Sequence, residues 1–238
     1  MARILLYLSL LVAFLFIFSG YGYQWGVWSL GVGFSIMRYS AYAAMLLFVI
    51  NMIAIWVNRK STASVVTYLV ISGIVTLIIS GTALYWQQKA QSVPPIHDIT
   101  TDLVNPPDFV ALIRLREDAP NPPEYAGEEV AALQREAYPQ IESLILNEDL
   151  PQVMDRAVMI IVNRKWQLVA IDRDEGRIEA TEKLPWFGFS DDIVIRFIEE
   201  NSNTRVDMRS KSRIGRSDIG VNARRIERFL NDLERGFY

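Results

Sequence analysis

The sequence predicts a membrane protein in two parts: three transmembrane helices, then a small α+β domain. Three observations predict this class. The first is a set of three uncharged apolar runs: ILLYLSLLVAFLFIFS from Ile4, YSAYAAMLLFVINMIAIWV from Tyr39 and VVTYLVISGIVTLIISGTALYW from Val65. The second is charge, because residues 1–86 carry four basic side chains and no acid, whereas 20 basic and 27 acidic residues follow. The third is a series of strand-like segments between two amphipathic segments.

Each apolar run is long enough to cross a bilayer, whose hydrocarbon core of about 30 Å needs roughly 20 helical residues. We predict spans at about 4–23, 39–57 and 65–86, within a transmembrane region of residues 1–88. A cleaved signal peptide is the alternative for the first run, although no small-residue cleavage site follows it. Aromatic residues that favour the membrane interface follow instead: Tyr21, Tyr23, Trp25 and Trp28.

The basic residues beside the spans predict the orientation. A cytoplasmic N-terminus places Arg3, Arg59 and Lys60 inside, against Arg38 and Lys89 outside. The C-terminal domain then lies outside the cytoplasm, and the absence of cysteine is compatible with an oxidising compartment.

Residues 89–127 are predicted to form a proline-rich tether and docking segment, because their Pro-Pro pairs disfavour helix and central strand. An α+β domain is predicted over 128–238. It begins with a short helix near 128–138 and a second helix from Leu150. Strands follow at 166–172, 177–184, 192–199 and 204–213, and a closing helix begins near Asn222.

The last predicted strand alternates sharply between two kinds of side chain. Val206, Met208, Ser210 and Ser212 share one face, while Arg205, Asp207, Arg209, Lys211 and Arg213 share the other. A four-stranded antiparallel sheet has an apolar face that must be covered, and the two amphipathic helices are the available cover. The predicted order is α-β-β-β-β-α.

Three motifs resemble a known family: IHDITTD (96–102), LPWFGFSDDIVIRF (184–197) and RSKSRIGRSDIGVNARRIERFL (209–230). Together they are similar to the bacterial family catalogued as domain of unknown function 1499, over about residues 93–235. In resembling chains the domain commonly follows a membrane anchor. The resemblance implies no reaction, cofactor or catalytic residue. With the orientation above, it implies the bacterial inner (cytoplasmic) membrane and a periplasmic C-terminal domain.

His97, Asp98 and Asp102 form the one polar cluster that suggests chemistry. Zinc takes three or four N, S or O ligands, and a single histidine without cysteine does not supply them. We therefore predict no metal and no cofactor. The acids either hydrogen-bond the neighbouring backbone in a docked segment or serve an enzyme acting on an envelope substrate.

The PWFGF segment places Trp186, Phe187 and Phe189 between two predicted strands. One interpretation is buried packing at the sheet edge. The other is an apolar rim that contacts an acyl chain or the bilayer surface.

The stretch from Arg209 to Ile226 carries six basic residues and one acid, Asp218. One interpretation is a solvated charged face that pairs with acids of the neighbouring strand. The other is a site for an anion at the start of the last helix, whose free amides favour negative charge; either Asp218 or Asn222 caps that helix. The residues of this anion site would be Arg209, Lys211, Arg213, Arg216, Ser217, Asn222 and Arg225.

These features predict a non-catalytic, membrane-tethered envelope protein. Its outer domain would bind an anionic lipid, a small anion or a membrane-protein partner. Nucleic acid is excluded as a partner, because the part after Trp86 has a net charge of −7 and lies outside the cytoplasm.

Overall fold

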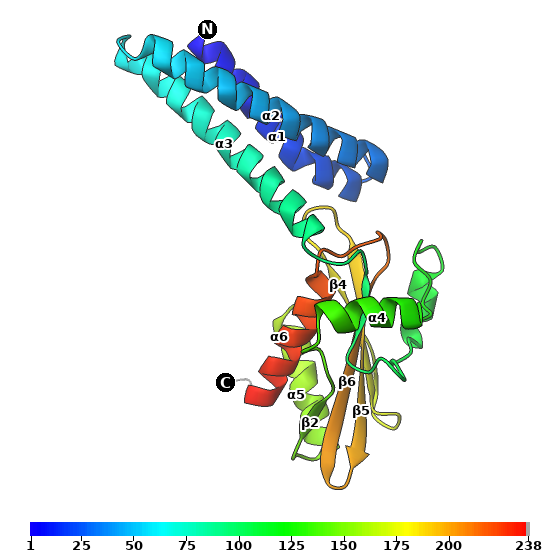
Figure 1. Ribbon diagram of the computed structural model, residues 1–238. Coiled ribbons are helices and arrows are strands. Elements are labelled where there is room, and N and C mark those ends of the chain that lie inside the picture. Colours follow the sequence, from blue (N-terminus) through cyan, green and yellow to red (C-terminus); the bar gives the residue numbers. More distant parts are fainter. Residues whose placement is uncertain (237–238) are drawn as a thin grey trace. The chain divides into compact units, whose positions relative to one another are not determined.

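The computed structural model describes residues 1–236, which fall into two compact units (Figure 1). The helical unit is Met1–Gln91 together with Pro185–Gly188. The α+β unit is Ser92–Leu184 together with the chain from Phe189 onward. The last of the three long helices continues to Gln91, and residues 92–127 of the predicted tether and docking segment fall within the α+β unit.

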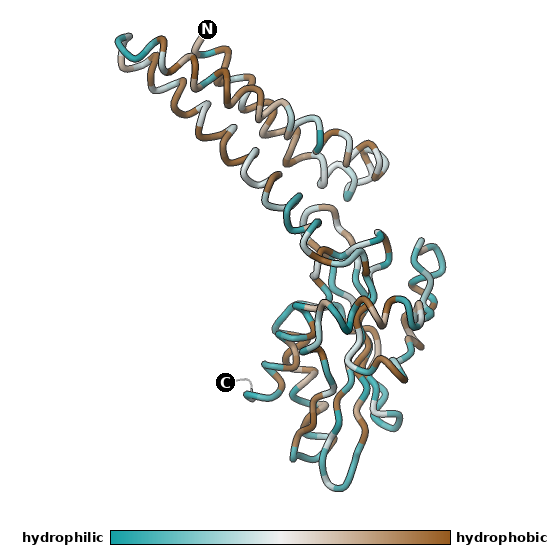
Figure 2. Tube along the Cα trace, viewed as in Figure 1, coloured by the Kyte–Doolittle hydropathy of each residue, from teal (hydrophilic) through white to brown (hydrophobic). Residues whose placement is uncertain are grey.

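The helical unit contains α1 (Ala2–Gln24), α2 (Leu30–Asn58) and α3 (Ala63–Gln91). Each helix is long and apolar enough to cross a membrane, and Figure 2 shows hydrophobic residues along much of their length. The three predicted spans lie inside these helices. At about 1.5 Å per residue, α2 and α3 are roughly 43 Å long, which exceeds a hydrocarbon core of about 30 Å.

Small and polar side chains lie where these helices meet. Ser9 of α1 and Ser72 of α3 share a hydrogen bond of 2.6 Å, and Ala44 of α2 is fully buried. The Thr76 hydroxyl donates to the Ser72 carbonyl at 3.0 Å. Small residues allow the backbones to approach closely, which is how helices associate without a hydrophobic driving force.

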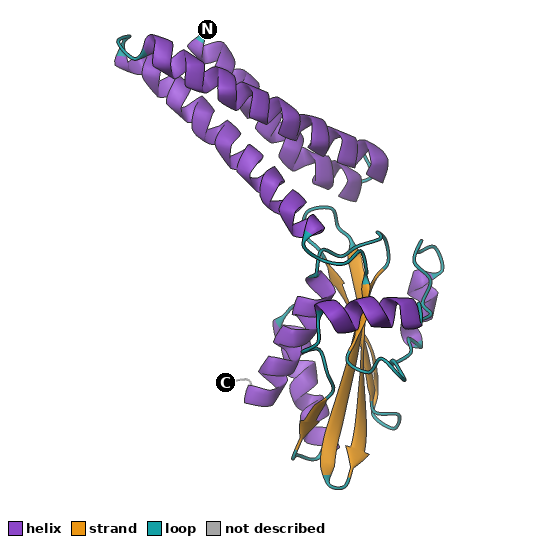
Figure 3. Cartoon of the chain, viewed as in Figure 1, coloured by secondary structure: helices purple, strands orange, loops and turns teal. Residues whose placement is uncertain are grey.

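The α+β unit begins with β1 (Asp98–Thr100) and the short 3₁₀ helix η1 (Ala111–Arg116). Its remaining elements, drawn in Figure 3, are α4 (Glu128–Ala137), β2 (Leu144–Leu146), α5 (Leu150–Asn163), β3 (Gln167–Asp172), β4 (Arg177–Lys183), β5 (Ser190–Glu200), β6 (Asn203–Ser212) and α6 (Val221–Arg235).

The sheet is antiparallel, with the strand order β1-β6-β5-β4-β3. The strand β2 also pairs with β6, so the sheet has six strands where four were predicted. The predicted four are β3 to β6. The other two contain three residues each, which is too short for a period of two to be visible in the sequence.

Helices α5 and α6 cover one face of the sheet, as predicted. The core beneath them includes Ile160 of α5, Phe229 of α6 and Met208 of β6, all fully buried. The ring of Trp166 stacks on that of Phe229, with 5.7 Å between centroids. The predicted alternation of β6 is confirmed on this side by Val206 and Met208.

Residues 101–125, which we call the strap, cover the opposite face. Phe109 and Leu112 of the strap pack on Val194, which β5 directs away from the two helices. The strap includes η1, and most of its remaining length has no regular structure. It forms a second, mainly irregular layer of the domain, within the segment predicted to be a proline-rich tether and docking segment.

Candidate functional site

Charged side chains line the face of the sheet beneath the strap. Every second residue of a strand points to this face, and the register places Lys211 of β6 between Asp98 of β1 and Asp192 of β5. We call the set the charged layer; its members are Asp98, Asp102, Arg116, Arg177, Glu179, Asp192, Arg196, Arg205, Asp207, Arg209, Lys211 and Arg213.

Asp98 binds two cations at once. Arg209 donates from Nε and Nη2 to the two carboxylate oxygens at 2.9 and 2.8 Å, and the Lys211 Nζ lies 3.0 Å from Oδ2. The exposed fractions of these side chains are 1 % for Asp98, 0 % for Arg209 and 2 % for Lys211. The contact is a buried, bidentate ion pair with a second cation attached.

The strap completes the environment of these cations. Arg209 donates to the carbonyls of Pro107 and Pro123 at 3.2 and 2.9 Å, and Lys211 donates to that of Glu124 at 2.5 Å. Burial lowers the pKa of Lys211, an effect that Asp98 opposes. Burial also raises the pKa of Tyr125, whose ring lies 5.4 Å from the Arg209 guanidinium, to about 12.

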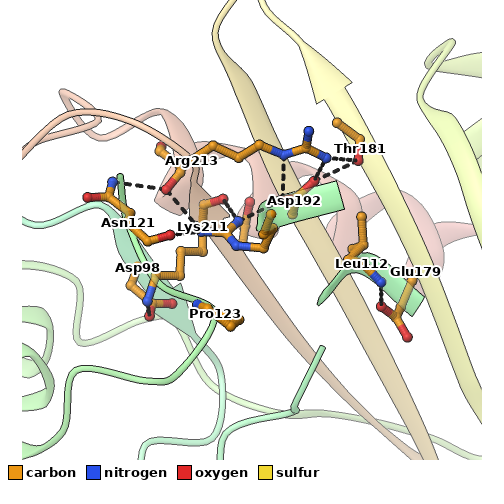
Figure 4. Close-up of polar contacts among 12 residues, drawn as sticks. Asp98, Leu112, Asn121, Pro123, Glu179, Thr181, Asp192, Lys211 and Arg213 are labelled. Carbon is orange, nitrogen blue, oxygen red and sulfur yellow. Dashed lines mark hydrogen bonds and ion pairs between the residues drawn. The ribbon is translucent and has the colours of Figure 1, made fainter. Parts of the chain in front are cut away.

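Asp192 is the second centre of the layer (Figure 4). Arg116 of η1 donates to it at 2.7 Å, and Arg213 donates to both carboxylate oxygens at 2.8 Å. The Thr181 hydroxyl donates at 2.6 Å. Burial lowers the pKa of Arg116, although Asp192 raises it. This carboxylate therefore joins the strap to three strands of the sheet.

Glu179 has a role that the sequence did not suggest. Its buried carboxylate accepts hydrogen bonds from the amides of Val110, Ala111 and Leu112 at the start of η1, at 2.9–3.2 Å. Arg177 donates to it at 3.1 Å. A strand residue thus satisfies the free amides of a short helix in the strap.

His97, Asp98 and Asp102 do not converge. Asp98 is occupied by Arg209 and Lys211, whereas Asp102 accepts hydrogen bonds from Arg196 at 3.1 Å and Arg205 at 2.8 Å. His97 Nδ1 lies 3.4 Å from the Arg216 carbonyl, and burial lowers its pKa. Among residues 1–236 no group of three His, Asp or Glu side chains could hold a metal ion.

The residues of the predicted anion site are mostly occupied by partners within the chain. Arg225 donates to Glu182 and to Asp191, both at 2.6 Å. Asn222 contacts Ser210, Ser212 and the His97 carbonyl, and Ser217 donates to the Pro94 carbonyl at 3.5 Å. Arg209, Lys211 and Arg213 have the carboxylate partners described above. Only the side chain of Arg216 is exposed and without a contact among the described residues.

The start of α6 is also filled from within. The Asp218 carboxylate accepts hydrogen bonds from the amides of Gly220 at 2.8 Å and Asn222 at 2.6 Å. The N-cap position of α6 is Gly220, and Asp218, rather than Asn222, supplies the carboxylate that binds amides at the start of this helix. The other interpretation of residues 209–226 was a solvated charged face that pairs with acids of the neighbouring strand. The pairing with acids of neighbouring strands is present, but Arg209 and Lys211 are buried and not solvated.

Two of the three predicted rim aromatics belong to the helical unit. The Trp186 Nε1 donates to the Ile17 carbonyl at 2.7 Å, and the buried Phe187 ring stacks on Phe34 with 5.0 Å between centroids. Gly20 allows this packing, because a Cβ there would lie 2.5 Å from Trp186 Cδ1. Phe189 lies in the α+β unit, is half-buried, and its carbonyl accepts from the Leu184 amide.

An apolar surface lies at the far edge of the sheet, and the sequence did not point to it. Met159 and Val162 of α5 are 53 % and 61 % exposed, and Leu168 and Ile171 of β3 are 37 % and 40 % exposed. We call these four residues the β3 margin. A register shift between Leu168 and Ala170 breaks the alternation of β3, which hid the pattern.

The charged layer is arranged as a structural device. Acid–base catalysis needs a group that can reach a substrate, whereas Asp98, Asp192 and Glu179 are buried and bound to cations or to amides of the strap. These contacts hold an irregular segment on a sheet face. The four side chains of the β3 margin, by contrast, are exposed among the described residues.

The comparisons with known proteins agree with the sequence motifs. The family model described as "Protein of unknown function (DUF1499)" matches residues 98–233, a stretch that runs from β1 into α6. No curated protein matches the chain, and no solved structure does. The matched residues include all six strands and the whole charged layer, and they make up more than half of the sequence. The chain therefore belongs to the DUF1499 family.

Proposed function

We propose that the chain is a non-catalytic, membrane-tethered protein of the bacterial envelope whose α+β domain binds a membrane-protein partner through the β3 margin. The observation that carries this proposal is the contrast between two surfaces. The charged groups of the layer have partners inside the domain, whereas the four residues of the β3 margin are at least one-third exposed. A patch of exposed apolar side chains indicates an interaction site, whereas single scattered apolar side chains on a surface do not.

The proposed location is the inner (cytoplasmic) membrane, with a cytoplasmic N-terminus and a periplasmic domain. An odd number of spans places the two ends of the chain on opposite sides of the membrane. The short Asn58–Ser61 connection carries Arg59 and Lys60, and positive short loops favour the cytoplasm.

An anionic ligand at residues 209–225 has less support. Arg209, Lys211, Arg213 and Arg225 are bound to carboxylates, and Asp218 occupies the amides at the start of α6. A phosphate group would have to displace these internal anions before it could bind.

The enzyme alternative has less support for a similar reason. His97, Asp98 and Asp102 contact different partners. A recess of about 170 Å³ lies beside Arg177 and Arg196, but both guanidinium groups already bind carboxylates.

Site-specific photo-crosslinking in native membranes tests the proposal. A photoreactive amino acid is placed at Leu168 or Met159, and the matched control is Ile145 of β2, which is 60 % exposed. We expect a discrete protein adduct from the margin positions and none from the control. Equal adducts from all three positions, lipid adducts only, or no adduct would contradict the proposal.

A further inference from the structure

We infer that the partner of the β3 margin is a second copy of this chain, whose β3 pairs antiparallel with β3 of the first copy across a twofold axis. The inference rests on the proposed function, because it names the occupant of the same surface. Three independent features support it: an open strand edge, apolar residues that match themselves under a twofold rotation, and opposite charges at the two ends of the strand.

The first feature is the open edge. Within residues 1–236, β3 pairs with β4 alone, whereas the outer edge of β6 is occupied by β1 and β2. An edge strand presents unpaired amides and carbonyls, and soluble proteins usually protect it with lysine, proline or a covering segment. The segment QLVAID from Gln167 to Asp172 contains neither lysine nor proline.

The second feature is the position of the apolar residues. The register shift in β3 places Leu168 opposite Ala180 and Ile171 opposite Ile178, so both point to the face that α5 covers. A twofold axis between Val169 and Ala170 would set Leu168 of each copy opposite Ile171 of the other. Met159 and Val162 of α5 lie on the same face and would widen the apolar contact.

The third feature is charge. Arg164 and Lys165 precede the strand, Asp172 ends it, and Asp174 and Glu175 follow it after Arg173. Within the chain, Arg164, Asp172 and Arg173 already form ion pairs with Asp232, Arg177 and Asp155. The same axis brings the basic end of one strand against the acidic end of the other, twice over. The side chains of Lys165 and Asp174 lie at equal steps from the axis and are exposed, with no partner among the described residues. Parallel pairing would instead set like charges together.

The membrane anchor favours such a contact. Two copies held in one membrane meet at a far higher effective concentration than two free domains in solution. A modest strand-to-strand contact can therefore be populated in the membrane.

Charge reversal tests the pairing. Full-length protein is reconstituted in lipid nanodiscs or mild detergent, and its mass is measured by light scattering and mass photometry. We expect a dimer for the wild type, and about tenfold weaker association for Lys165→Glu or Asp174→Lys, because in each dimer two opposite-charge pairs beside the paired strands become like-charge pairs. The double variant Lys165→Glu/Asp174→Lys should restore association. Near-UV circular dichroism confirms that every variant is folded.

Cysteine pairing tests the register. The chain has no cysteine, so each introduced thiol is unique. One tagged copy carries Leu168→Cys and a second, differently tagged copy carries Ile171→Cys; directly opposed residues bring Cβ atoms within about 4.5–5.5 Å. We expect a mixed disulfide from this pair and none from two copies of Ile145→Cys.

A monomeric wild type without the mixed disulfide would overturn the inference. If photo-crosslinking at Leu168 then captures a different protein, the inference fails while the proposed function stands. If no protein adduct forms at Leu168 either, both fail. A dimer that forms unchanged in the charge variants and without the mixed disulfide would place the interface elsewhere and also refute the inference.

Discussion

Replacing Asp98 by Asn removes the carboxylate that neutralises two buried cations. The side chain keeps its size, but Arg209 and Lys211 lose the negative charge and one of the two acceptor oxygens, and retain a neutral amide oxygen and the backbone carbonyls of the strap. Removing one partner of a buried ion pair costs roughly 3–5 kcal/mol, because a buried charge is left without compensation. For a domain of this size, about 1 kcal/mol lowers the unfolding midpoint by roughly 2–4 °C. We therefore expect a decrease of about 6–20 °C for Asp98→Asn.

Thermal unfolding of the full-length chain in nanodiscs, followed by near-UV circular dichroism, measures this change. Hydrogen exchange of peptides from β5 and β6 reports whether the loss is confined to the α+β unit. The matched control is Asp108→Asn, because Asp108 is exposed and has no partner among the described residues; a surface change of this kind stays within about 0.5 kcal/mol.

A second variant distinguishes loss of the ion pair from general damage. Asp98→Asn combined with Lys211→Met removes one of the two cations left without a counterion, and should recover part of the lost stability, because residues in direct contact are not additive. Added salt should change the effect of Asp98→Asn little, since buried pairs are weakly screened. If Asp98→Asn unfolds within about 2 °C of its Asp108→Asn control, the charged layer does not stabilise the fold as argued.

Three further predictions use other parts of the chain. Arg209→Met should lower the unfolding midpoint of the domain more than Lys211→Met does. Arg209 makes two hydrogen bonds to Asp98, whereas burial of the Lys211 ammonium group lowers its pKa and so already disfavours its charged form. Equal effects of the two variants would contradict this. Burial raises the pKa of Asp218, although the Asn222 and Gly220 amides lower it. Folding therefore favours the protonated carboxyl group, and this contribution to stability is lost as pH rises through the folded-state pKa. Asp218→Asn should therefore equal or exceed wild-type stability at pH 7 and match it below pH ~4, while Asp218→Ala should lose about 1 kcal/mol of capping; urea titrations over this pH range would expose the opposite trend. A reporter active only outside the cytoplasm should work when fused after the C-terminal residue and fail at Ser61, and the reverse result would invert the proposed orientation.

The sequence was most informative where periodicity was long. The three long apolar helices, the alternation of β6 and the apolar stripe of α6 follow directly from hydrophobic spacing, and the structure contains all three. Hydrophobic spacing works because burial in a helix or strand repeats every 3.6 or 2 residues. Segments without such a repeat were correspondingly misjudged.

The strap is the clearest case of this failure. Its prolines indicated a tether and docking segment, but its apolar anchors Phe109 and Leu112 are too few and too irregularly placed to predict that it forms a covering layer. The alternating charges of β6 were consequently expected either on a solvated face or in an anion site, whereas the structure buries Asp207, Arg209 and Lys211. Glu179 shares a strand face with Thr181 and Arg177, which is a weak indication that it belongs to a polar layer. Its role as acceptor for the η1 amides was not predictable, because those amides lie nearly 70 residues away in the sequence.

The edge strand β1 has a consequence for how the protein is made. Asp98 and its partner Arg209 are separated by 111 residues. At a synthesis rate of about 5–20 residues per second, roughly 5–20 s pass between the appearance of one and the other. For most of that interval, until Val194 of β5 has been made, Phe109 and Leu112 have nothing to pack against. Nascent chains halted before β6 should therefore depend on chaperones, whereas chains released after β6 can close the domain in one step.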